Sequence, residues 1–179
     1  MSDKFDEFIQ KHIASETGGG TFDPEAEKAM WLGKLQALYA LVKASLSEHI
    51  DAGKVTLTFQ EIALMEEALG VYKVLEASIS IGRQVVKLTP VGTFLIGARG
   101  RVDMRGPRGV ARFLIVPPGS TAPRVRVAVV EPGKPPPARE AVAPPETWVW
   151  KIAGSPPRIT YADLTPDSFR DVLMGVMDG

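Results

Sequence analysis

The feature that most constrains the fold is the stretch from residue 74 to 90, VLEASISIGRQVVKLTP, where polar and apolar residues alternate on both sides of Gly-Arg. Gly82 fits the first central position of a two-residue type II′ turn. That turn places apolar residues opposite one another on one face: Ile79 with Val86, and Ala77 with Leu88. Ser78 then lies opposite Lys87 on the other face. Because turn and alternation agree, we predict an antiparallel hairpin here.

Further strands are expected at 93–96, 100–105, 110–117 and 124–131, with a last pair at 147–152 and 158–164. The proline-rich stretch 132–145 cannot pair in a sheet, since proline has no N–H to donate. After the last strand, Thr165 can cap a helix that begins at Pro166 and repeats apolar residues at helical spacing. Consecutive strands joined by short turns favour a barrel-like or sandwich-like meander.

The sequence before the hairpin has helical periodicity. A first helix is predicted over 3–14, followed by a flexible joint at 17–20, TGGG. A long second helix starts after the N-cap residue Asp23 and runs to about residue 50, with Gly53 near its C-terminal end. The capping-box pattern formed by Thr58 and Glu61 predicts a third helix over 59–69.

These elements define an α+β protein: a helical N-terminal segment, then a mainly antiparallel β-meander with a packed C-terminal helix. We predict two parts. Residues 1–70 form a helical N-terminal region, and residues 71–179 form an antiparallel β domain that includes the C-terminal helix.

The zero net charge of the chain hides an uneven distribution. Residues 1–80 carry seven Lys and thirteen acidic residues, whereas residues 81–132 carry eight Arg, one Lys and two acidic residues. All eleven arginines lie at or after Arg83. Such a distribution indicates either pairing between the two segments or an anionic partner.

The positive charge is densest in residues 97–113, GARGRVDMRGPRGVARF. We predict a hairpin that turns at Pro107, with Gly109 in a left-handed conformation. A two-residue loop would place Asp103 opposite Arg112, and a bulge would place it opposite Phe113. The five candidate binding residues in this stretch are Arg99, Arg101, Arg105, Arg108 and Arg112.

Three interpretations of these arginines stay open. They are a solvated surface paired in part with the acidic helices, a protein-binding surface, or a surface for phosphate or nucleic acid. Against nucleic acid, the chain is neutral overall, and Phe94 and Phe113 are the only aromatic residues in 81–132. Helix-turn-helix, RRM and zinc-finger signatures are absent from the sequence.

Catalytic motifs are equally scarce. The chain has no cysteine, and its two histidines, His12 and His49, each project onto the apolar face of a predicted helix. Asp163, Asp167 and Asp171 are spaced by four, which could suggest a metal site. Helix capping and the helix dipole, however, account for acidic residues at the start of the helix predicted from Pro166. We therefore expect no catalytic residue, no metal and no cofactor.

The sequence favours a non-catalytic protein-interaction module, a component of a multi-protein assembly or a homo-oligomer, that uses the arginine-rich hairpin. The alternatives are a nucleic-acid-binding protein using the same hairpin, and an enzyme with an unrecognised site. A signal peptide and a long apolar run are both missing from the sequence, so we expect a cytoplasmic protein without a membrane partner.

Overall fold

A computed structural model describes residues 22–93, 95, 98–123, 131–135 and 143–178. The helix predicted over 3–14 and the joint at 17–20 lie outside these residues. The strand predicted at 124–131 lies outside them too, except for its last residue.

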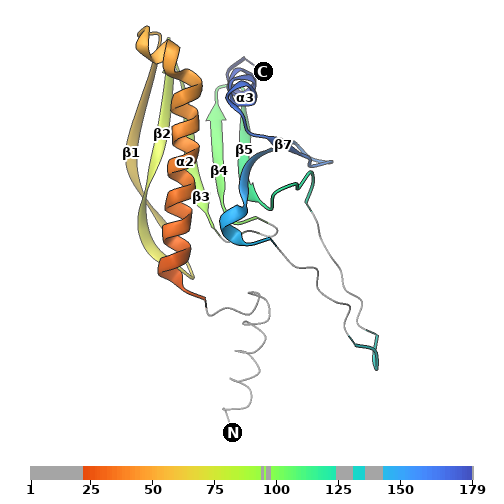
Figure 1. Ribbon diagram of the computed structural model, residues 1–179. Helices are drawn as coiled ribbons and strands as arrows, with labels where there is room; N and C mark the ends of the chain where they lie inside the picture. Colours follow the sequence, from red (N-terminus) through yellow and green to blue (C-terminus); the bar gives the residue numbers. More distant parts are fainter. Residues whose placement is uncertain (1–21, 94, 96–97, 124–130, 136–142, 179) are drawn as a thin grey trace.

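The described residues form an α+β fold built on one antiparallel sheet of seven strands (Figure 1). In chain order the elements are α2 (Pro24–Asp51), β1 (Val55–Glu66), β2 (Gly70–Ile81), β3 (Gln84–Gly92), β4 (Arg101–Gly106), β5 (Gly109–Val116), the 3₁₀ helix η1 (Pro145–Thr147), β6 (Val149–Ala153), β7 (Tyr161–Asp163) and α3 (Pro166–Asp178). Each strand pairs with the next, so spatial order follows chain order. The predicted fold class is confirmed, with the meander forming an open sheet instead of a closed barrel.

Both helices pack on the same face of this sheet. Tyr39 of α2 contacts Phe59 of β1 edge to face, with ring centroids 5.3 Å apart. Phe169 of α3 lies 6.3 Å from Phe113 of β5, measured between ring centroids. The core between them holds fully buried side chains from the sheet: Ala77, Ile79, Val86, Leu88, Val102, Met104 and Phe113.

The hairpin predicted around Gly82 is confirmed residue by residue. Gly82 has a φ of 60°, which a type II′ turn requires at this position. β2 and β3 pair in the expected register: Ile79 with Val86, Ala77 with Leu88, and Ser78 with Lys87. The long helix is confirmed as well, because the Asp23 side chain accepts hydrogen bonds from the N–H groups of Glu25 and Ala26.

The helix predicted over 59–69 is wrong. These residues belong to β1 and to the turn after it, and β1 pairs with β2 over twelve residue positions. Thr58 caps no helix, and Glu61 instead forms an ion pair with Lys73 on the neighbouring strand at 2.7 Å. The capping pattern is a local signal, whereas pairing with β2 satisfies the backbone of the whole segment, so tertiary context overrides it.

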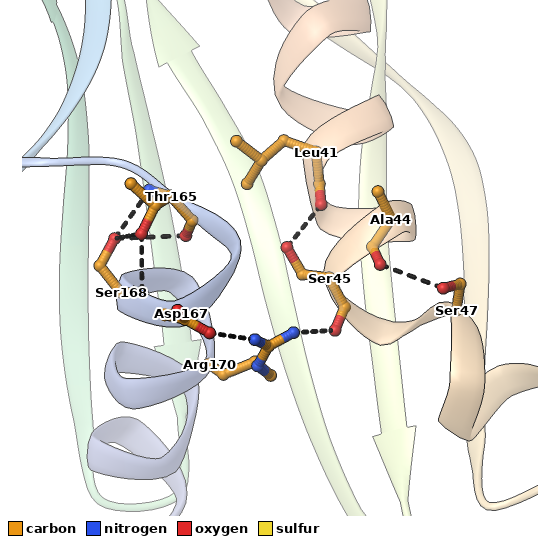
Figure 2. A network of polar contacts seen from close by, with 8 residues as sticks. All are labelled: Leu41, Ala44, Ser45, Ser47, Thr165, Asp167, Ser168 and Arg170. Atoms are coloured by element: carbon orange, nitrogen blue, oxygen red, sulfur yellow. Dashed lines mark hydrogen bonds and ion pairs between the residues drawn. The ribbon is translucent and has the colours of Figure 1, made fainter.

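Polar contacts at the start of α3 fix this helix beside α2 (Figure 2). The Ser168 N–H donates to the Thr165 hydroxyl at 3.1 Å, which confirms the predicted cap. Arg170 forms an ion pair with Asp167 and donates a second hydrogen bond to the carbonyl oxygen of Ser45 in α2, at 3.0 Å. α3 therefore has a fixed position over the sheet.

The far end of α3 touches the tip of the β4–β5 hairpin. The Arg108 N–H donates to the carbonyl oxygen of Val176 at 2.9 Å. A Cβ atom on Gly106 would lie 2.3 Å from that same oxygen, so only glycine permits this approach.

Gly106→Ala should therefore destabilise the protein by about 1–3 kcal/mol, the usual cost of overpacking. Gly109→Ala is the matched control, because its Cβ would meet nothing within 4 Å and its φ is not positive. Urea denaturation of both variants measures the difference. Equal stabilities would contradict the close contact between the hairpin tip and α3.

The predicted division after residue 70 falls just inside β2, which pairs with β1. The division into residues 1–70 and 71–179 stays a prediction. Buried residues from both sides of that point, among them Trp31, Val42 and Phe113, belong to one hydrophobic core.

We expect the isolated fragment 71–179 to lack the cooperative unfolding transition of the full chain, because it loses α2 and the partner of β2. Circular dichroism during thermal unfolding of both proteins tests this. A cooperative transition in the fragment would establish the division into two parts.

Candidate functional site

The register of the β4–β5 hairpin settles the alternative that the sequence left open. Gly106 pairs with Gly109, so Pro107 and Arg108 form a two-residue loop, and Asp103 lies opposite Arg112. Gly109 does not have a positive φ, so its expected left-handed conformation is wrong. The two-residue loop of Pro107 and Arg108 joins β4 to β5 without a left-handed residue at Gly109.

Asp103 is the centre of the candidate site. Only 3% of this residue is exposed, although it lies on the sheet face away from the helices. Arg101 donates to both carboxylate oxygens, from Nε at 2.7 Å and from a terminal nitrogen at 2.8 Å, and Arg105 donates at 3.4 Å. The hydrogen bond to Asp103 raises the pKa of the Arg101 guanidinium. Two arginines thus compensate the burial of one carboxylate.

The cross-strand neighbours extend this cluster. Arg112 is exposed and sits directly opposite Asp103, and among the described residues it forms no ion pair. Lys87, on β3, lies opposite Arg105 of β4 and forms a 3.4 Å ion pair with Glu76. We call the set of Lys87, Arg101, Asp103, Arg105 and Arg112 the arginine face.

Three of the five predicted site residues therefore meet: Arg101, Arg105 and Arg112. Arg99 lies elsewhere, because it forms an ion pair with Glu27 of α2 at 3.0 Å and its guanidinium lies 5.3 Å from the ring centroid of Trp148. These contacts hold α2 against the sheet. Arg108 is exposed in the hairpin loop, at the edge of the arginine face.

Sequence reasoning missed Lys87 as a site residue. The hairpin pattern placed it correctly opposite Ser78, but its position beside Arg105 depends on the pairing of β3 with β4. The pairing of those strands contains a register shift within β3, between Pro90 and Gly92. No short-range signal in the sequence fixes that shift.

The other candidates for chemistry have structural roles. His49 lines an open groove between α2 and α3 together with the apolar Leu46 and Leu173, as expected of the apolar face, but it is exposed; His12 lies outside the described residues. Asp167 pairs with Arg170, and Asp163 pairs with the buried Lys151 at 3.0 Å. In the described part of the chain, no group of three or more acidic or histidine side chains could hold a metal ion.

Comparison with protein families, with curated proteins and with solved structures finds no match for this chain. Within the described residues, neither helix is both long and apolar enough to cross a membrane.

Replacing the central carboxylate tests the cluster. Asp103→Asn should destabilise the protein by about 2 kcal/mol, because the partly buried Arg101 loses its charged acceptor while other cations remain close to it. Asp51→Asn, at the exposed end of α2, removes the same charge without a partner in the site and is the control. Chemical denaturation of both variants gives the comparison, and equal stabilities would show that the cluster is not structurally coupled.

Proposed function

We propose that this protein is a non-catalytic interaction module whose arginine face binds an acidic segment of a protein partner. The proposal rests on the surplus of fixed positive charge on the sheet face opposite the described helices. One buried carboxylate, Asp103, positions two guanidinium groups, and a third arginine, Arg112, lies across from it without an ion pair among the described residues.

The geometry of the arginines supports recognition of carboxylates. Asp103 holds Arg101 and Arg105 in place, so less side-chain entropy is lost on binding than for free arginines. The side chain of Arg105 is still 64% exposed and that of Lys87 is 53% exposed, so both remain accessible. A guanidinium group offers two parallel donors to a carboxylate, which suits an acidic partner.

Apolar neighbours favour a protein over a nucleic acid. Val110, which lies opposite Arg105, is 46% exposed, and Val85 on β3 is 47% exposed. Mixed arginine and aliphatic surface is typical of protein interfaces, whereas single-stranded nucleic acids bind to aromatic side chains on which bases stack.

The double variant Arg105→Gln/Arg112→Gln tests the proposal. It leaves the Arg101–Asp103 pair intact, so we expect it to fold normally and to lose proteins that the wild type captures from a lysate of the native host. Desolvated arginine anchors at interfaces are each worth about 2 kcal/mol or more, which is enough to remove a partner of moderate affinity.

Lys43→Gln/Arg158→Gln is the matched control, since both residues are exposed and lie outside the arginine face. It should capture the same proteins as the wild type. Nuclease treatment of the lysate shows whether capture depends on nucleic acid. Fluorescence anisotropy with mixed DNA and RNA oligonucleotides, over a range of salt concentrations, measures direct binding to nucleic acid. Steeply salt-dependent oligonucleotide binding, lost in the double variant, would favour a nucleic-acid function, and unchanged capture by the double variant would refute a binding role.

A further inference from the structure

The first strand of the sheet has an unusual edge. β1 is twelve residues long, pairs with β2 on one side, and has no strand beside it on the other side among the described residues. Such a row of free N–H and C=O groups is a template for pairing with another chain. The opposite edge differs, because β7 has only three residues.

Several of the devices that usually protect an edge are missing from β1, although the strand carries two charged residues, Glu61 and Glu66. Its sequence, VTLTFQEIALME, contains neither proline nor lysine, and its register with β2 runs without a bulge. The hairpin formed by β1 and β2 also has large apolar side chains on one face, each 43–82% exposed: Phe59, Met65, Val71 and Leu75. An exposed, long and partly apolar edge indicates an interface.

We propose that β1 pairs antiparallel with β1 of a second copy of this chain, which joins two sheets into one. Residues directly opposite in an antiparallel pair lie on the same face of the sheet. In a symmetric pair of identical strands, this requires one residue of β1 to lie opposite the same residue of the second copy, and the two-fold axis passes between these two residues. For near-complete overlap of the two strands, that residue is Gln60 or Glu61. An axis at Glu61 would place two identical carboxylates opposite each other, which disfavours it.

The register centred on Gln60 is complementary in charge. It places Lys54, which directly precedes β1, opposite Glu66 of the second copy, and the same pair recurs at the other end. The Glu66 carboxylate lies against Gly92 of β3 and accepts hydrogen bonds from the Tyr72 hydroxyl and from the Thr93 N–H at 2.9 Å, so it already has partners within its own chain. Lys54 is exposed and would be a further charged donor at the position that the register gives it.

Apolar contacts fit the same register. Met65, which is 82% exposed, would lie opposite Val55, which is itself buried within its own chain, and Ala63 would lie opposite the half-buried Leu57. A strand of this length spans about 40 Å, so the pairing would close the whole free edge. This dimer uses surface away from the arginine face and does not depend on the proposed function.

Sedimentation velocity of the full chain tests the association, and we expect dimers. Gln60→Lys should raise the dissociation constant by about tenfold or more, because two like charges then face each other at the axis. Gln36→Lys, on the exposed side of α2, makes the same charge change away from the edge and should leave the dimer intact.

A crosslink checks the register. The chain has no cysteine, so Gln60→Cys introduces a single thiol, and opposite residues on paired strands are close enough for a disulfide. Mild oxidation should link Gln60→Cys chains into dimers and leave Gln36→Cys chains unlinked. A wild-type chain that stays monomeric at high concentration, or a dimer that Gln60→Lys leaves unchanged, would overturn the proposal.

Discussion

The packing of α2 and α3 on a single face of the sheet is the constraint on which the rest of the structure depends. An antiparallel sheet can bury one face and leave the other in contact with water. Alternation along β4 then places Val102 and Met104 under the helices and sends Arg101, Asp103 and Arg105 to the other side. The arginine face is thus a direct consequence of where the helices lie.

The same constraint explains the uneven charge distribution along the chain. α2 carries four acidic residues and three lysines, so it offers little charge to neutralise the basic strands, and most arginines of β4 and β5 point away from the helices. Arg99, which precedes β4, is the exception and pairs with Glu27 of α2. Arg101 and Arg105 share Asp103, and Lys87 pairs with Glu76. Arg112 has no ion pair among the described residues, so the positive charge stays concentrated on one surface.

Local chemistry made most of the fold predictable. Caps at Asp23 and Thr165 and the turn at Gly82 each depend on a few neighbouring residues, and all three are confirmed. β1 could not be predicted, because its residues also fit a helix and only β2 decides between the two structures. Strand alternation correctly put Arg101 and Arg105 on one face, whereas the roles of Arg99 and Lys87 depend on tertiary contacts that the sequence does not encode locally.

The hydrogen bond from Arg108 to Val176 has a consequence for local motion. Amides in two-residue hairpin loops usually exchange with solvent quickly, since water reaches them directly. Here the Arg108 amide is covered by the last turns of α3, so it exchanges only when that end of the helix lifts from the sheet. Its deuterium uptake therefore measures the opening of the helix, and a single loop amide reports on an element more than fifty residues further along the chain.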